Sequence, residues 1–584
     1  MAQVYRSRPG WGRLSAMVQT EEPLSSPTGR ERALVPAILV VITFVGAVVR
    51  ATGISAGGLF YDDAWFALPA RVSFSTAIKM VVTTPGYTVL QSAWISLGPA
   101  GNTWPKLLPF VLGVAVIPAT YWLCRRMDLP RWASLVGTGL IAAAPAAIEY
   151  SVRVKEYEVD LLLAIAVLVV GEVARRRRTT ASLVCLAAVG IGAVLVSSAL
   201  LVVVAGSWLA LLLVCLGDRR RRGAVVLGAG VTAVACAVQA AWISTHIPAS
   251  LTKFWIDTDR LIGKPFSWPH LSHTLALTPG GLAHGFLGTP LPTGPFPLVR
   301  QITHSAEAAL LMLGVVEVAL LVVLGLPAIS AALRRRGDAP ALAFLAPTLT
   351  LVLAVGLWAV GLVPLGTGRT DLVLYPAIVL LVASGIVRLA TWLSTAGSFG
   401  AATRRTAAIG LAVVAGIAGV GLSWHQRSWY PAQDLDGLRS AMGPQLRPGD
   451  VEVVAGRNSF TWAFQGDSPF VIQVDRNDAR GRTVGFWVTF TPPRVLEVLP
   501  TRPSLLPQGA VAIPGLDAVP ASAHRLWVFA TTNATLSPSS YHLSGQVARA
   551  MTPIGIDPVL RKAGWFQQRK RFHAPGVVAV LYTR

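Results

Sequence analysis

The sequence predicts a polytopic α-helical membrane protein of about eleven transmembrane helices, followed by an extracytoplasmic α/β domain. Three observations support this class. Of the 584 residues, 53% are apolar and 13% are charged, whereas soluble domains carry about 25% charged residues. Long apolar runs recur throughout residues 33–424 and stop there, and arginine clusters separate several of them.

A helix needs about 20 apolar residues to cross the hydrocarbon core. Residues 181–216 carry no charge and lie between the arginine tetrads 175–178 and 219–222. As one helix this run would be about 54 Å long, so we expect it to cross twice, with a turn near Ser197 and Ser198. The candidate runs are 33–49, 107–124, 132–148, 159–174, 181–216, 223–243, 308–326, 339–363, 371–390 and 406–424.

The arginine distribution predicts the topology. The net charge of +22 does not indicate nucleic-acid binding, because the basic clusters lie between apolar runs, where they act as cytoplasmic topology signals. The N-terminus is then inside, and an odd number of crossings places the C-terminal part outside. The predicted parts are a cytoplasmic tail 1–32, a transmembrane domain 33–424 with outside loops 50–106 and 244–307, and a soluble α/β domain 425–584.

Short β-rich runs indicate the α/β character of the C-terminal part. These runs are 451–455, 470–474, 483–490, 526–530 and 577–582. Helix-like or Pro/Gly-rich stretches alternate with them. In the first outside loop, apolar residues at roughly helical spacing predict an amphipathic helix on the membrane surface; they are Trp65, Phe66, Leu68, Val72, Phe74 and Ile78.

An acidic pair, Asp62 and Asp63, lies just outside the first predicted span, in the aromatic segment 59–65. Two adjacent carboxylates in such a setting repel each other, which favours a raised pKa for one of them. The arrangement suits general-base chemistry or cation binding. The alternative is a solvated pair at a helix N-terminus, where Asp is a favoured capping residue.

Further motifs follow the acidic pair in a recognisable order. They are Thr84-Pro85-Gly86-Tyr87, Trp94, the stretch 97–109 (LGPAGNTWPKLLP) with Gly113, the stretch 150–157 (YSVRVKEY) and the stretch 366–376 (GTGRTDLVLYP). Over residues 33–390 this order resembles the GT-C superfamily of integral-membrane glycosyltransferases. The bacterial branch similar to protein O-mannosyltransferases and lipid A aminoarabinose transferases fits best.

The resemblance implies a transferase that moves a hexosyl or pentosyl group from a polyprenyl-phosphate donor. The acceptor would be a cell-envelope glycan, lipid or protein at the outer face of a bacterial inner membrane. Asp62 is the expected catalytic base, with Asp63 as the other acid of the catalytic pair. Lys155, Tyr157, Arg369 and Arg153 are the expected donor phosphate-binding residues. For the three cations the alternative is snorkelling toward lipid headgroups.

This chain departs from the family pattern at three positions. Arg153 stands where the family has an acid, and Lys155 and Lys106 stand where arginine is usual. No metal ligand is therefore assigned and no cofactor is certain. A divalent metal shared between the acidic pair and another carboxylate remains an option; the candidates are Glu149, Glu156, Glu158 and Asp160.

Two other function classes stay open. A membrane transporter or lipid flippase would favour internal repeats and charges within spans, whereas this chain has no evident repeat and collects its charges in outside loops. A noncatalytic envelope assembly protein would use residues 425–584 for contacts. Turnover of a lipid-linked sugar separates the enzyme from both alternatives.

Overall fold

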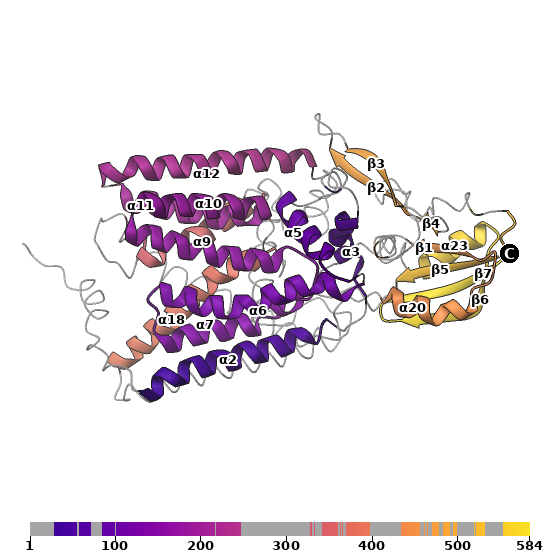
Figure 1. Cartoon of the computed structure of the whole chain (residues 1–584), viewed down its shortest axis with the longest axis horizontal. Helices are drawn as coiled ribbons and strands as arrows, with labels where there is room; N and C mark the ends of the chain where they lie inside the picture. The colour runs from indigo at the N-terminus through magenta and orange to yellow at the C-terminus, as the bar shows by residue number, and fades with distance from the viewer. Residues whose placement is uncertain are drawn as a thin grey trace, which may run out of the picture.

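The structure is a computed structural model of the whole chain, a helical bundle with a β-sheet domain at one end (Figure 1). It describes the following residues together with a few isolated positions: 29–54, 58–71, 84–99, 101–216, 218–246, 342–359, 370–396, 434–455, 470–477, 483–490, 495–498, 521–531 and 553–584. The predicted spans 308–326 and 406–424, the loop 244–307 apart from its first residues, and nearly all of the tail 1–32 lie outside them.

The helices of the bundle run side by side, with α9 near the centre (Figure 1). Their bounds are α2 Gly29–Ala51, α6 Thr103–Arg126, α7 Arg131–Ala143, α8 Pro145–Tyr150, α9 Tyr157–Arg177, α10 Thr180–Val196, α11 Leu201–Cys215, α12 Arg219–His246, α17 Leu345–Ala359 and α18 Tyr375–Ala396. Among the described residues, four helical stretches are long and apolar enough to cross a membrane: Leu34–Ala51, Thr103–Arg126, Ser198–Cys215 and Arg221–Thr245.

Two of the predicted runs are interrupted in the structure. The run 181–216 breaks at Ser197, which has extended backbone geometry, and a 3₁₀ turn η2 (Ser198–Leu200) leads into α11. The predicted turn is therefore present. The run 132–148 is wrong as a single helix, because α7 ends before Ala144 and α8 starts at Pro145. Proline lacks an N–H donor and disfavours the helical conformation of the residue before it.

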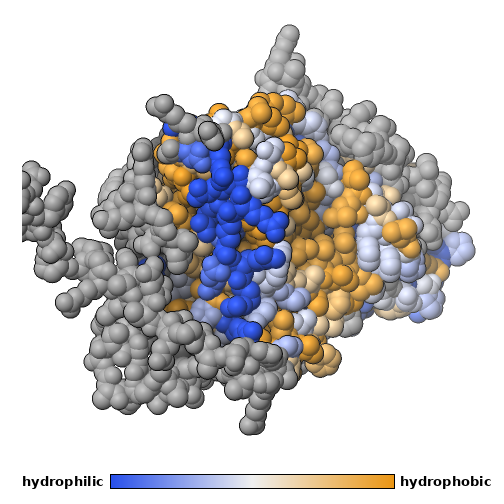
Figure 2. All heavy atoms as spheres, turned by 60° about the vertical axis from the view of Figure 1, so that its left-hand side comes forward, coloured by the Kyte–Doolittle hydropathy of each residue, from blue (hydrophilic) through white to orange (hydrophobic). Residues whose placement is uncertain are grey.

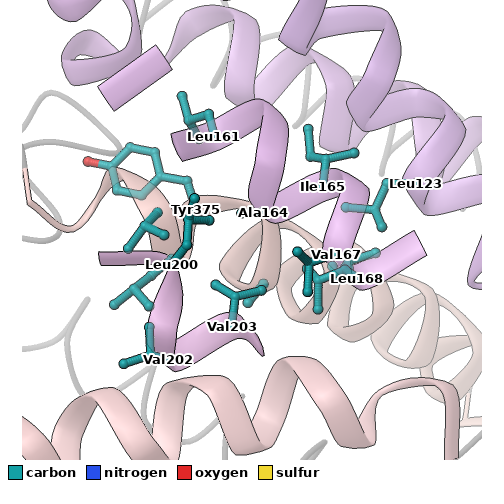
Figure 3. Close-up of a cluster of buried hydrophobic side chains, with 14 of the residues drawn as sticks. Leu123, Leu161, Ala164, Ile165, Val167, Leu168, Leu200, Val202, Val203 and Tyr375 are labelled. Carbon is teal, nitrogen blue, oxygen red and sulfur yellow. The ribbon is translucent and has the colours of Figure 1, made fainter. Parts of the chain in front are cut away.

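The bundle core surrounds α9. Leu161, Ala164, Ile165 and Leu168 on this helix are at most 2% exposed and pack against side chains of α6, α11 and α18. Figure 3 shows these side chains together with Leu123, Val203 and Tyr375, which come from the neighbouring helices. Their burial holds α9 in place, and with it the segment that precedes its first turn.

One end of the bundle carries a band of arginines, here called the basic belt. Arg176 Nη2 lies 2.7 Å from Asp128 Oδ2 and donates to the carbonyl of Arg126 at 2.7 Å, so the ends of α6 and α9 meet there. Figure 2 shows this end as a hydrophilic band bordered by apolar surface. Its described members are Arg125, Arg126, Arg131, Arg175, Arg176, Arg177, Arg178, Arg221 and Arg222.

The C-terminal domain is a five-stranded mixed sheet at the opposite end of the bundle (Figure 1). The strand order is β4-β1-β5-β7-β6, with β1 parallel to β4 and β5, and β7 antiparallel to β5 and β6. A separate hairpin pairs β2 with β3. The bounds are β1 Val451–Ala455, β2 Phe470–Asn477, β3 Thr483–Phe490, β4 Val495–Val498, β5 Arg525–Thr531, β6 Phe566–Ala574 and β7 Val577–Thr583.

All five predicted β-runs are strands, and the sequence missed two. The missed strands are β4 and the edge strand β6, whose sequence FQQRKRFHA is too charged to show a strand pattern. Pairing with β7 nevertheless extends β6 along the sheet edge, with a register shift between Gln567 and Arg571. Edge strands tolerate such charge because one side of the strand stays in solvent.

Alternate residues of the sheet face two different partners, as the period of two requires. On β5, Leu526, Val528 and Ala530 join a cluster with Leu560 of α23 (Pro553–Lys562). Trp527 and Phe529 face the other way, into a cluster with α20 (Leu435–Met442) and residues of the segment between α2 and α6. We call this second cluster the shared core; it contains Leu59, Ala64, Ala67, Leu68, Ile95, Val154, Leu435, Leu438, Met442, Phe464, Trp527, Phe529, Val577, Ala579 and Leu581.

Candidate functional site

The acidic pair lies in the first turn of a short helix, α3 (Tyr61–Ala67), which a 3₁₀ turn η1 (Leu68–Arg71) extends. Phe60 occupies the N-cap position and makes no side-chain cap hydrogen bond, so neither aspartate caps the helix. Carboxylates in a first turn interact favourably with the helix dipole. Leu68 is 1% exposed in the shared core, so this part of the loop packs on protein. Val72, Phe74 and Ile78 of the predicted membrane-surface helix lie outside the described residues.

Asp63 forms a buried ion pair with Arg153. Arg153 Nε lies 2.7 Å from Asp63 Oδ2 and 2.9 Å from Oδ1, and the two side chains are 6% and 2% exposed. A second nitrogen of the same guanidinium, Nη1, lies 3.3 Å from Glu149 Oε1. Burial opposes the charge of Arg153, but Asp63 and Glu149 outweigh this and raise its pKa above the ordinary value.

Asp62 forms the second ion pair, with Lys155. Lys155 Nζ lies 2.9 Å from Asp62 Oδ2, and the lysine side chain is 4% exposed whereas that of Asp62 is 22% exposed. The ammonium also lies 3.5 Å from the centre of the Phe66 ring, a cation–π contact. Burial lowers the pKa of Lys155 below its ordinary value, and Asp62 opposes this shift.

These four side chains, Asp62, Asp63, Arg153 and Lys155, form what we call the ion-paired quartet. Two residues from α3 meet two from the segment between α8 and α9, so each adjacent acid has its own cation. The repulsion expected within the acidic pair is thereby compensated. Asp63 is enclosed by Arg153, whereas Asp62 is partly exposed, so Asp62 is the more accessible carboxylate of the pair.

Glycines allow the cation-bearing segment to approach the bundle closely. A Cβ atom on Gly113 of α6 would lie 2.6 Å from Ser151 Cβ and 3.0 Å from Glu158 Oε2. A Cβ on Gly53, after α2, would lie 2.6 Å from a methyl group of Val152. Both distances are shorter than ordinary contacts, so residues 151–158 depend on glycine at these two positions.

The tryptophans of the sequence motif have a structural role. Trp94 of α5 (Pro85–Ser96) stacks on Trp104 of α6, with ring centroids 4.7 Å apart and planes 2° from parallel. Each indole N–H donates to the other residue's carbonyl, at 2.9 Å and 2.7 Å. A Cβ on Gly98 would overlap the Trp104 ring at 1.9 Å. The motif therefore joins α5 to the start of α6, beside Lys106.

Of the other two predicted phosphate-binding residues, the structure describes one. Tyr157 is 9% exposed at the start of α9, with its ring 4.8 Å from that of Tyr150 in an edge-to-face contact. Arg369 lies outside the described residues. The residues that follow it form η3 (Leu372–Leu374), which contacts α9, and Figure 3 shows Tyr375 near Leu161 and Leu200. The late-loop motif thus reaches the same end of α9 as the quartet.

The sequence missed several residues that complete the site. Phe60 and Tyr150 lie beneath the Arg153 guanidinium, 5.0 and 5.8 Å from it, and Phe66 lies beneath Lys155. The aromatic character of 59–66 was a usable signal, but the pairing partner of each ring depends on the tertiary fold. Within the described residues, no group of three or more His, Cys, Asp or Glu side chains could hold a metal ion, and Glu149 instead contacts Arg153.

No protein-family model matches the chain, and no curated protein sequence matches it. The chain is similar in structure to ArnT. Crystal structures of ArnT from Cupriavidus metallidurans match at 12% identity and TM-score 0.47 in the apo state, and at 13% identity and TM-score 0.45 bound to undecaprenyl phosphate.

The match to ArnT is long, covering 94% and 95% of this chain and 98% of each ArnT chain.

The quartet combines two features that a group-transfer site needs. Arg153 and Lys155 supply positive charge in a largely buried setting, where an anion is bound more strongly than in water. Asp62 supplies a reachable carboxylate 2.9 Å from Lys155. The site can therefore bind an anionic leaving group and, next to it, accept a proton from a hydroxyl.

Proposed function

We propose that this protein is a membrane glycosyltransferase that moves a hexosyl or pentosyl group from a polyprenyl-phosphate donor to a cell-envelope acceptor. The observation that carries the proposal is the ion-paired quartet: two buried cations and a reachable carboxylate at one end of an apolar bundle. A donor with an apolar tail and a phosphate headgroup matches this combination, because the tail can lie against the apolar helices while the phosphate meets Lys155 and Arg153.

The chemistry requires little of the protein. The acceptor hydroxyl oxygen attacks the anomeric carbon, the bond from that carbon to the phosphate oxygen breaks, and polyprenyl phosphate leaves with the electron pair. Asp62 takes the hydroxyl proton. Lys155, Arg153, Arg369 and Tyr157 stabilise the charge on the departing phosphate. Attack from the side opposite the phosphate inverts the anomeric configuration.

Lys155 changes partner during binding in this scheme. Without donor its ammonium lies on Asp62; with donor it turns to the phosphate, which frees Asp62 to act as a base. Asp63 keeps Arg153 in place on the other side. The scheme uses no metal, in line with the pairing of Glu149 to Arg153.

We place the quartet and the C-terminal domain on the outer face of a bacterial inner membrane, with the N-terminus inside and about eleven crossings. The support is the separation of charges along the bundle: the basic belt lies at the end of α9 opposite to the quartet. Basic residues are retained on the cytoplasmic side. On this placement residues 33–424 are the catalytic membrane domain and 425–584 the extracytoplasmic domain.

Cysteine labelling tests this topology. In a chain with its four cysteines replaced by alanine, Ala563→Cys lies in the exposed turn directly after α23, and Arg131→Cys lies in the basic belt. We expect a membrane-impermeant maleimide added to intact cells to label only the first. Labelling of both positions after lysis is the control, and protection of Ala563→Cys in intact cells would contradict the outward placement.

Donor binding tests the phosphate assignment directly. We expect Lys155→Ala and Arg369→Ala to weaken binding of undecaprenyl phosphate in nanodiscs by about 10- to 100-fold, since each charge-assisted hydrogen bond contributes about 1.5–3 kcal/mol. Arg369→Lys should be milder, because it keeps the charge and loses the bidentate geometry. Arg126→Ala in the basic belt is the matched control and should leave affinity unchanged. Equal affinities for all variants would contradict the phosphate-binding assignment.

The same titration has a predicted pH dependence. Because burial lowers the pKa of Lys155, its ammonium loses its proton at a lower pH than that of an exposed lysine, and donor affinity should fall as pH rises through this value. Lys155→Arg should shift this decrease in donor affinity to higher pH.

Binding of the donor without sugar transfer to any acceptor would favour a flippase or transporter. Absence of both donor binding and sugar transfer would favour an assembly protein.

A further inference from the structure

The helix that carries the acidic pair is too short to be stable by itself. α3 has seven residues, and its N-cap Phe60 makes no side-chain cap hydrogen bond. Isolated helices below about 12–15 residues are marginal in water, so the conformation of α3 depends on what packs against it. The ion pairs to Arg153 and Lys155 hold the polar side of its first turn.

The apolar side of the same helix belongs to the shared core. Ala64 and Ala67 of α3, with the flanking Leu59 and Leu68, are at most 1% exposed and cluster with side chains of the C-terminal sheet and α20. From the sheet come Trp527 and Phe529, both fully buried. Residues more than 450 positions apart therefore form one core, directly behind Asp62 and Asp63.

The two parts also interact electrostatically. Asp434 caps α20 by accepting from the N–H of Gly437 at 2.9 Å, and its own N–H donates to the carbonyl of Pro575. The carboxylate of Asp434 lies within electrostatic range of Lys106, which is also within range of Asp63 and Arg153. Lys106 is 4% exposed, so its ammonium interacts with charges of both parts from a buried position.

We propose that the C-terminal domain is a positioning element of the reaction: the shared core fixes α3, and thereby sets Asp62 against Lys155 and Asp63 against Arg153. The kinetic consequence of this inference rests on the proposed transferase function. Its structural consequence rests on the geometry alone. Leu438, Phe529 and Trp527 are positioning residues, because they act through α3 and do not touch the reacting atoms. Displacement of α3 by about 1 Å is enough to lower a rate up to about 100-fold.

Two leucines form a matched pair of probes. Leu438 of α20 and Leu560 of α23 are both 0% exposed and cover opposite faces of the same sheet. Leu438 belongs to the shared core, whereas Leu560 belongs to the cluster remote from α3. Leu438→Ala and Leu560→Ala thus make the same chemical change in the same domain. A general loss of domain stability affects both variants, whereas loss of support for α3 affects only the first.

The first measurement is hydrogen–deuterium exchange of the full-length protein in detergent. We expect Leu438→Ala to speed exchange across residues 59–71 and Leu560→Ala to leave it as in the wild type. Leu438→Met, which refills most of the volume, should restore slow exchange. Equal exchange of α3 in wild type and Leu438→Ala, or equal acceleration by both alanine variants, would overturn the proposal.

The second measurement is transfer kinetics with an undecaprenyl-phosphate sugar. We expect Leu438→Ala to lower kcat by about 10- to 100-fold with a smaller change in KM, and Leu560→Ala to change neither by more than about threefold. Unchanged kcat in Leu438→Ala would refute the kinetic part of the inference. Lack of transfer by wild-type protein would refute the transferase function alone, since the exchange experiment still decides whether the shared core holds α3.

Discussion

Asp62→Asn is expected to lower sugar transfer by about 10²- to 10⁴-fold, the usual range for loss of a general base. Asparagine keeps the size and the hydrogen-bonding capacity of aspartate, and Lys155 can still donate to its amide oxygen. The variant loses only the ability to accept the hydroxyl proton. Transfer should be measured at saturating donor and acceptor, so that the change appears in kcat.

Asp63→Asn provides the comparison within the same turn. Asp63 is enclosed by Arg153, with a side chain that is 2% exposed, so its substitution should act on the position of Arg153 and on stability more than on proton transfer. We expect Asp62→Asn to fold normally and fail in catalysis. If both variants kept near-wild-type transfer at normal membrane levels, the assignment of the base would be wrong.

Arg153→Ala is expected to destabilise the protein by about 3–5 kcal/mol, the cost of leaving one partner of a buried ion pair without its counter-charge. The group left without this counter-charge is the buried carboxylate of Asp63. Thermal unfolding of the purified protein in detergent measures the effect. Arg221→Ala is the matched control, because the side chains of its pair with Asp218 are 49% and 36% exposed and such pairs contribute about 0–1 kcal/mol.

The double substitution Asp63→Leu with Arg153→Met separates charge burial from packing. Replacing both members of a buried pair by apolar groups of similar volume is often neutral for stability. We therefore expect the double variant to recover most of the stability that Arg153→Ala loses, yet to remain inactive in transfer. A double variant less stable than Arg153→Ala would show that the pair itself stabilises the fold.

The fold follows from the sequence where one physical constraint dominates. The break at Ser197 could be predicted, because an uncharged run between two arginine tetrads is too long for one crossing, and five strands were evident from their apolar β-rich runs. The break at Ala144 was missed because Ala143, Ala144 and Ala146 to Ile148 continue the apolar run through Pro145. Hydropathy alone does not register a missing N–H donor.

The sequence predicted which residues form the site, but not which of them pair with each other. The motifs identified Asp62, Asp63, Arg153 and Lys155, and the structure brings all four together. From the sequence, Arg153 and Lys155 were expected to bind a phosphate, and Asp62 and Asp63 to act in catalysis. In the structure each of these cations forms an ion pair with one of the acids. Which cation meets which acid depends on the approach of residues 151–158 at Gly113 and Gly53. No pattern along the chain contains that information.

The charges on the edge strand β6 oppose pairing between the sheets of two copies of the chain in one membrane. A sheet edge offers unpaired N–H and C=O groups, and copies held at the same height above a bilayer would present these edges to each other in two dimensions. Arg569, Lys570 and Arg571 occupy the middle of β6. Like charges facing one another across such a contact repel, and a bulged register does not match a flat partner. The strand that the sequence pattern failed to reveal thereby protects the domain against edge-to-edge aggregation.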